Sequence, residues 1–298
     1  MKKLPRKITI VGAGKVGSTL ALLFKDNGFE IVSVISRTEK SAKKLSRIAK
    51  CKTISTSVKD VSPQTEFLLL AVPDRVLKNV ADEIATTLKI NFKKLLVAHV
   101  SGIHSVEVLS SLKKKGAKIA GIHPIQTFPK NISIQQLNKN ISNNIVFGIE
   151  CEKKLQPTMK KLARTLGGSS IVIPAKTGIK PLYHLACVIA SNFPIVLLKM
   201  LEEISSHFHF SKDWKKTFSP ILFSSISNAL TTSPVSALTG PFVRSDVKTI
   251  ESHLNALKKY SPQLISIYKE LGKLATSSSI ESGSISRAEK NGILSILK

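Results

Sequence analysis

The feature that most constrains this chain is a glycine-rich stretch that directly follows a run of β-forming residues. Residues 8–11 favour a strand, residues 12–17 follow the pattern Gly-x-Gly-x-x-Gly, and residues 18–24 continue with helical periodicity. A dinucleotide site needs this order, because the glycines permit a tight turn and a close approach of the backbone to a pyrophosphate at the helix N-terminus. The sequence therefore predicts a dinucleotide site formed by Gly12, Ala13, Gly14, Lys15, Val16 and Gly17.

Alternating strand and helix patterns continue to about residue 174, with apolar runs typical of buried parallel strands. From Thr177 onward the strand pattern disappears and four stretches show helical spacing. The chain is therefore predicted to be an α/β protein: a doubly wound Rossmann-like sheet over residues 1–174, followed by an all-helical domain over residues 175–298. Within the latter, residues 184–201 are predicted to form a buried core helix and residues 276–279 a loop.

The net charge of +26 raises nucleic acid as a partner. The charge is spread over both halves, mostly as lysine and without an arginine-rich block, which argues against nucleic acid and suits an anionic cofactor or substrate. The three cysteines lie far apart without a Cys-x-x-Cys pair, so neither a metal site nor a disulfide framework is expected. Because the N-terminus lacks a signal-peptide pattern and polar residues interrupt the most apolar window, we expect a cytoplasmic protein that does not enter a membrane.

The expected end of the second strand carries basic and hydroxyl side chains where an NAD site would place a carboxylate. A guanidinium and two hydroxyls suit a 2′-phosphate, so NADP(H) is favoured over NAD(H). The alternative is that the arginine is simply solvated. The residues concerned are Ser36, Arg37 and Thr38.

Candidate ligand-binding residues follow the later strands, at the edge where open α/β sheets bind ligands. The backbone after the strand at 67–72 is expected to line the nicotinamide, through Ala71, Val72 and Pro73. Asp74 could contact a ligand or cap the next helix. Ser101 and His123 leave the next two strands, and His123 could contact a substrate or only a backbone carbonyl.

Two further candidates lie in the helical half. His184 and Ser191 share one face of an apolar helix, and Pro194 is expected to kink it beside Asn192. This polar cluster suits a substrate wall, although a buried histidine with ordinary partners explains it equally well. Arg244 precedes a helix that Asp246 would cap, and a fixed arginine binds carboxylate or phosphate well.

These motifs together resemble a family of Rossmann-like proteins with a C-terminal helical domain of unknown function, described as NADP-dependent oxidoreductases. That family is similar to pyrroline-5-carboxylate reductases and β-hydroxyacid dehydrogenases. Ser245 departs from its usual glycine, so a positive φ there would be strained. The matching stretches are the glycine turn, residues 71–74, 99–102, 123–128, 183–192 and 239–246.

From the residues we expect an NADP(H)-dependent oxidoreductase that acts on a small anionic C=O or C=N substrate in an interdomain cleft. The resemblance implies a nicotinamide site with the active site between two domains, but it supplies no substrate. It also implies a homodimer formed through the helical domain. His184 would donate a proton or anchor the substrate, Arg244 would hold its anionic group, and the orienting residues would be Ser101, His123 and Asn192. The alternatives are a non-catalytic NADP(H)-binding module, a nucleic-acid binder, and a prephenate dehydrogenase, the last suggested by the Gly-x-His-Pro stretch at Gly121.

Overall fold

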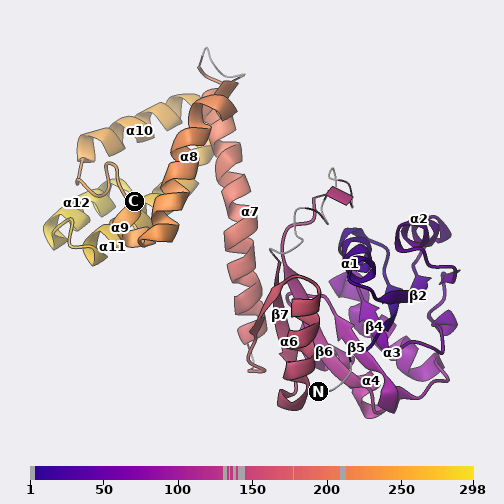
Figure 1. Cartoon of the computed structure of the whole chain (residues 1–298). Coiled ribbons are helices and arrows are strands. Elements are labelled where there is room, and N and C mark those ends of the chain that lie inside the picture. The colour runs from indigo at the N-terminus through magenta and orange to yellow at the C-terminus, as the bar shows by residue number, and fades with distance from the viewer. Residues whose placement is uncertain are drawn as a thin grey trace. The chain divides into compact units, whose positions relative to one another are not determined.

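The computed structural model describes residues 4–129, 133, 135–136, 139, 145–176, 178–208 and 213–298. The chain forms two compact units, residues 1–191 and 192–298, and helix α7 (Ile179–Ser205) belongs partly to each. Figure 1 shows a sheet flanked by helices in the first unit and helices in the second.

The first unit is built on an eight-stranded sheet with the order β3-β2-β1-β4-β5-β6-β7-β8. Its strand pairs are parallel, except that β7 runs antiparallel to β6. The strands are β1 (Lys7–Val11), β2 (Glu30–Ile35), β3 (Ile54–Ser55), β4 (Phe67–Leu70), β5 (Leu96–His99), β6 (Lys118–Ile125), β7 (Val146–Cys151) and β8 (Ser169–Val172).

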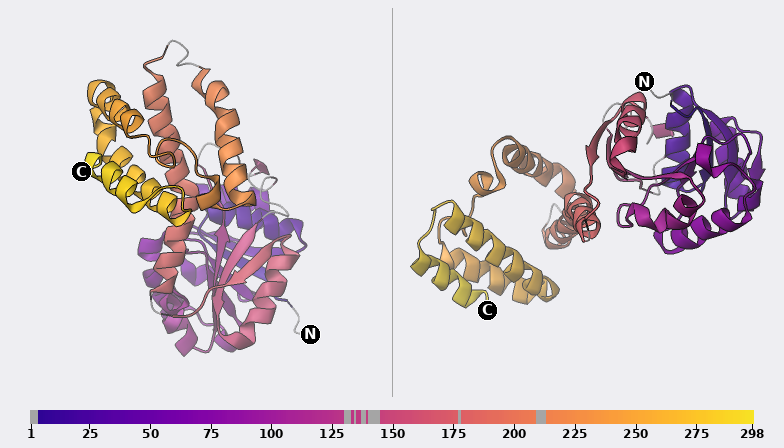
Figure 2. Two further views of the ribbon diagram at one scale, coloured as in Figure 1. Left: turned by 90° about the vertical axis from the view of Figure 1, so that its left-hand side faces the viewer. Right: turned by 90° about the horizontal axis from the view of Figure 1, so that it is seen from below.

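Helices cover both faces of this sheet, as the two views of Figure 2 show. One apolar core joins the sheet to α1 (Lys15–Asp26), α2 (Glu39–Ala49) and α6 (Gln156–Thr165). The other joins it to α3 (Asp74–Thr87) and α4 (Ser110–Lys114). The predicted fold class is thereby confirmed, but the antiparallel β7 and the short β3 were not foreseen.

The second unit consists of helices, which confirms the expected all-helical second half. They are the end of α7, α8 (Trp214–Thr231), α9 (Pro234–Ala237), α10 (Val247–Tyr260), α11 (Ile265–Glu281) and α12 (Arg287–Ile296). The loop predicted at residues 276–279 is wrong, because α11 continues through it. Its hydroxyls bond inside the helix instead: Thr276 Oγ1 donates to the Gly272 carbonyl at 2.7 Å and Ser279 Oγ to that of Ala275 at 2.9 Å.

The prediction that residues 184–201 form a buried core helix is also wrong. Exposed apolar side chains lie along α7, among them Leu182 at 61% and Ile195 at 63%. No residue of α8 is buried, and Phe223 is 73% exposed. Within the described residues α7 is the one helix long and apolar enough to cross a membrane, a criterion of length and composition that is weak evidence by itself.

Candidate functional site

The glycine turn between β1 and α1 contains two glycines that the fold itself requires. Gly12 has a φ of +109°, and a Cβ on it would overlap the carbonyl oxygen of Ala71. A Cβ on Gly17 would overlap the carbonyl oxygen of Gly12. These two residues therefore let β1, the segment after β4 and α1 approach one another closely.

Gly14 differs from these two glycines. Its φ is −73°, which other residues adopt, and a Cβ placed on it would meet nothing within 4 Å. It is the N-cap of α1, no side chain caps that helix, and its first turn carries no acidic residue. Packing therefore does not explain a glycine here, whereas a pyrophosphate lying on the helix N-terminus would need the space that a side chain fills. The residues present fit a dinucleotide.

The segment after β2 presents Arg37 as an exposed side chain. Thr38 is engaged locally as the N-cap of α2, since its Oγ1 accepts from the Ser41 backbone N–H at 3.3 Å and donates to Ser41 Oγ at 2.9 Å. Ser36 is half-buried, and its backbone N–H donates to the Ser55 carbonyl at 3.0 Å. Arg37 is thus the residue of the three best suited to a 2′-phosphate.

The segment after β4 packs against the glycine turn. The Ala71 backbone N–H donates to the Val11 carbonyl at 2.7 Å, which places this segment beside the end of β1. Pro73, not Asp74, is the N-cap of α3, so the capping role considered for Asp74 is wrong. The structure thereby brings Ala71, Val72 and Pro73 next to the predicted dinucleotide site.

Buried polar contacts stabilise the backbone at the end of β5. The Ser101 backbone N–H donates to His99 Nδ1 at 3.1 Å, and the His104 N–H donates to Ser101 Oγ at 3.0 Å. Ser101 is buried and His99 is fully so. Because Nδ1 accepts, neutral His99 carries its proton on Nε2, a buried atom without a hydrogen-bond partner among the described residues.

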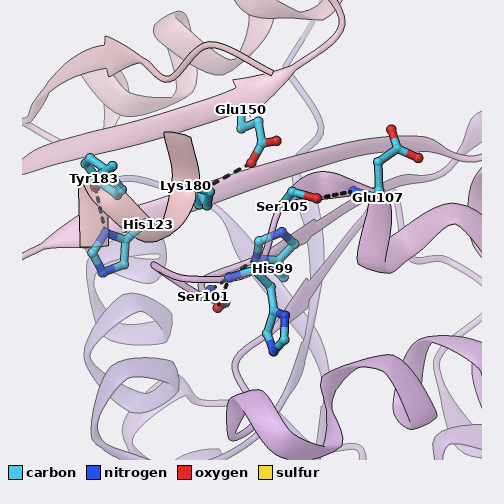
Figure 3. Close-up of polar contacts among 9 residues, drawn as sticks. His99, Ser101, Ser105, Glu107, His123, Glu150, Lys180 and Tyr183 are labelled. Atoms are coloured by element: carbon cyan, nitrogen blue, oxygen red, sulfur yellow. Dashed lines mark hydrogen bonds and ion pairs between the residues drawn. The ribbon is translucent and has the colours of Figure 1, made fainter. Parts of the chain in front are cut away.

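His123 lies inside β6 and not beyond its end, which corrects the sequence-based placement. It is paired with Gly148 of β7, and a Cβ on Gly148 would overlap Tyr183 Oη. The phenol therefore occupies the space that this glycine leaves on the sheet. There Tyr183 Oη lies 2.7 Å from His123 Nδ1. Figure 3 marks this hydrogen bond between the two side chains.

A buried ion pair lies on the same face of the sheet. Gly121 of β6 is flanked by His99 of β5 and Glu150 of β7. The Lys180 ammonium reaches the space beside Gly121 from the start of α7, and its Nζ lies 3.3 Å from Glu150 Oε2 (Figure 3). Both side chains are about 5% exposed, so this pair is shielded from water.

His184 completes this cluster. A Cβ on Gly102 would lie 2.6 Å from His184 Cδ2 and 2.9 Å from His123 Nε2, so both imidazoles contact the backbone after β5. The structure thus brings together three predicted residues, Ser101, His123 and His184. Asn192 and Arg244 lie in the second unit. There the hydrogen bonds from Thr249 lower the pKa of Asp246, and the positive charge of Arg244 adds a smaller effect in the same direction.

Burial and charge keep the two strand histidines neutral. Burial, reinforced by the Lys180 ammonium, lowers the pKa of His99 to about 3. The same two causes, with His184 adding to them and Asp74 opposing them, lower the pKa of His123 to about 4. Burial also raises the pKa of Tyr183 and lowers that of Lys180, although Glu150 acts against the latter change.

The sequence patterns do not predict Lys180, Glu150 or the role of Tyr183. The available signal was a pair of glycines, Gly121 and Gly148, inside otherwise apolar strands, since such glycines mark a close approach by another part of the chain. Within the described residues no group of three or more histidine, cysteine or acidic side chains could hold a metal ion.

Comparisons with known proteins match the two halves separately. Residues 1–124 match a Rossmann-like domain, and residues 145–275 match a domain of unknown function, DUF2520. The chain therefore carries the domain combination that its motifs suggested. No match was found among curated proteins.

Solved structures share this fold over nearly the whole chain. A candidate NADP oxidoreductase from Bacteroides fragilis is 23% identical with a TM-score of 0.73, covering 92% of this chain and 98% of its own. A protein from Thermotoga maritima is 27% identical with a TM-score of 0.69, covering 92% and 99%. An imine reductase from Myxococcus stipitatus in complex with NADP+ is 13% identical with a TM-score of 0.64, covering 97% and 98%.

Proposed function

We propose that this protein is an NADP(H)-dependent oxidoreductase that transfers a hydride to or from the C=O or C=N bond of a small, anionic substrate. The observation that carries the proposal is Gly14, a glycine that the fold does not require, at the uncapped start of α1. The solved structures support it, since one contains NADP+ and another is described as an NADP oxidoreductase.

Each part of the chain then has a defined task. The turn from Gly12 to Gly17 binds the pyrophosphate, Arg37 the 2′-phosphate, and the backbone of Ala71 and Val72 lines the nicotinamide. The nicotinamide, when bound, supplies the hydride. His184 anchors the substrate or supplies a proton, beside Ser101 and His123, while the tasks given to Asn192 and Arg244 remain predictions from the sequence.

The nucleotide preference tests this proposal. Wild-type protein is expected to bind NADPH more tightly than NADH in calorimetric titrations. Arg37→Ala should weaken NADPH binding by about tenfold or more, because a charge-assisted hydrogen bond contributes roughly 1.5–3 kcal/mol, and should leave NADH binding within about twofold. Lys40→Ala, which removes an exposed positive charge in the first turn of α2, three residues after Arg37, is the control.

The outcomes separate the parts of the proposal. An equal loss for both nucleotides in Arg37→Ala would assign Arg37 to a general role such as contact with the adenine. Binding of neither nucleotide by the wild-type protein would refute the proposed function as a whole.

We further propose that the protein is a soluble, cytoplasmic homodimer formed through the exposed apolar residues of α7 and α8. These helices expose large aliphatic and aromatic side chains, and contiguous exposed apolar surface is typical of interaction sites. A second copy suits this surface because an isologous contact covers the same residues on both chains. In the second unit they are Phe193, Ile195, Val196, Leu197, Ile221, Phe223, Ile226 and Leu230.

Light scattering should give wild-type protein twice the chain mass of 32.4 kDa. Phe223→Glu should shift it toward the monomer, because a carboxylate would be buried in the contact. Ile171→Glu, at an exposed apolar residue of β8, should remain a dimer. A monomeric wild type, or a protein extracted only with detergent, would contradict this proposal.

A further inference from the structure

The start of α7 packs on the sheet through two side chains, each of which fills the space left beside a glycine. Lys180 lies beside Gly121, and Tyr183, one helical turn later, lies on Gly148. Their positions are linked, since the Lys180 ammonium also lies 5.6 Å from the centre of the Tyr183 ring. The result is that Tyr183 Oη is fixed at 2.7 Å from His123 Nδ1.

The direction of this hydrogen bond follows from the neighbours of the phenol. Tyr183 has two acceptors within reach of its O–H: His123 Nδ1 and the sulfur of Cys187, one turn further along α7. Sulfur is a weak acceptor and an imidazole nitrogen a strong one, so the phenol donates to Nδ1. A neutral imidazole that accepts at Nδ1 carries its proton on Nε2.

The charge of His123 is set by the groups that face it. Burial and the nearby Lys180 ammonium both oppose a positive charge on the ring and so lower the pKa of His123, and Asp74 only partly offsets them. The titratable groups that face the ring are Lys180, Tyr183 and His184 of α7, Asp74 of α3 and His99 of β5. Uncharged His123 is therefore the form present at neutral pH.

Nε2 lies on the opposite edge of the ring from Tyr183. It is 2.9 Å from the point where a Cβ on Gly102 would lie, beside the His184 ring. In the part of the chain that the structure describes, no group hydrogen-bonds this atom. An N–H held here is a donor that is not fully buried, so a bound substrate can reach it beside the segment that follows β5.

We infer that His123 serves the proposed reaction as an uncharged hydrogen-bond donor through Nε2–H, and that Tyr183 and Lys180 are the positioning residues that fix its tautomer and its neutrality. The inference rests on the proposed function for its chemical meaning. The donor would polarise the oxygen of a C=O bond, or the lone pair of an unprotonated C=N nitrogen, while a hydride from the reduced nicotinamide adds to carbon. His123 keeps its Nε2 proton, and the anion formed on oxygen or nitrogen would take its proton from His184 or from water. A protonated iminium has no such lone pair, so the substrate class is a carbonyl or a neutral imine.

The test uses the full chain without nucleotide, labelled with ¹⁵N-histidine, and reads the tautomer and charge of each ring from long-range ¹H–¹⁵N correlations. The His123→Gln variant assigns the His123 signals. Wild-type His123 should be neutral with its proton on Nε2 at pH 7, and should stay neutral down to about pH 5. Tyr183→Phe should reduce the preference for this tautomer by about five- to tenfold, since one hydrogen bond is lost.

A double variant tests how the Lys180 ammonium affects the charge of the His123 ring. Lys180→Met with Glu150→Leu removes the whole ion pair, avoids an unpaired buried carboxylate, and should raise the pKa of His123 because the repelling ammonium is gone. Tyr268→Phe is the control: it removes the phenol of the other such pair, in which Oη lies 2.9 Å from His253 Nδ1, and should leave the His123 signals unchanged.

A His123 ring that is charged at pH 7, protonated on Nδ1, or unaltered in Tyr183→Phe would overturn the inference. Because these signals are recorded without nucleotide, they decide the inference whether or not NADPH binds. Failure of the proposed function is read separately, from the nucleotide titrations.

Discussion

Gly14→Ala is expected to weaken NADPH binding by about tenfold or more while the thermal midpoint of unfolding stays within about 2 °C of the wild type. The added methyl group meets no protein atom within 4 Å and the backbone is in a conformation that alanine adopts. The one expected loss in the free protein is the small preference of an N-cap for glycine over alanine. The bound pyrophosphate, in contrast, needs to lie against this backbone. Calorimetric titration and thermal unfolding of the same sample measure both quantities.

Two matched variants make this result interpretable. Gly17→Ala should destabilise the fold by about 1–3 kcal/mol or more, because its Cβ would overlap the carbonyl oxygen of Gly12. Gly292→Ala adds a methyl group to α12, where it also meets nothing within 4 Å, and should bind NADPH as the wild type does. Normal NADPH affinity in Gly14→Ala would mean that the turn serves only the fold.

The sheet was predictable because its strands and its first turn leave strong local patterns. The uninterrupted apolar runs that became β4 and β5 are buried on both faces, and the glycine turn has the expected strand and helix on either side. The antiparallel β7 was not predictable in this way. An apolar run does not encode strand direction, which depends on the connection between β6 and β7.

Burial in the second half could not be read from hydropathy. The apolar pattern of α7 indicates a helix that avoids water, yet the pattern is the same whether its cover comes from this chain or from another molecule. The loop predicted at residues 276–279 was wrong for a local reason. Serine and threonine favour turns when their side chains compete with the backbone, but here they bond to carbonyls one turn earlier.

The site was predictable where one segment defines it and unpredictable where three strands meet. The order of residues along the chain is enough to predict Arg37 and Gly14 as cofactor-binding residues. The partners of His123 come instead from the register that places Gly148 opposite it and from the start of α7. The ion pair was equally unpredictable from the sequence, because Glu150 and Lys180 are far apart in the chain and charged residues are rarely buried unless paired.

Lys180→Met is expected to lower the free energy of unfolding by about 3–5 kcal/mol, because it leaves a buried carboxylate without its partner. The loss should exceed that of an exposed pair by several fold, since such pairs contribute roughly 0–1 kcal/mol. Lys78→Met, in the exposed pair with Asp82 on α3, is the matched control. Urea unfolding of both variants gives the comparison.

The double variant Lys180→Met with Glu150→Leu should recover most of the lost stability, because two apolar side chains of similar size replace two charges that had to leave water. A recovery of this kind would show that the fold does not need the ion pair for its stability, since an apolar pair would serve the fold as well. The role of the pair would then lie with the two histidines beside it, whose pKa values are lowered by burial and further by the ammonium. A double variant as unstable as Lys180→Met would instead make the ion pair a structural requirement of α7 on the sheet.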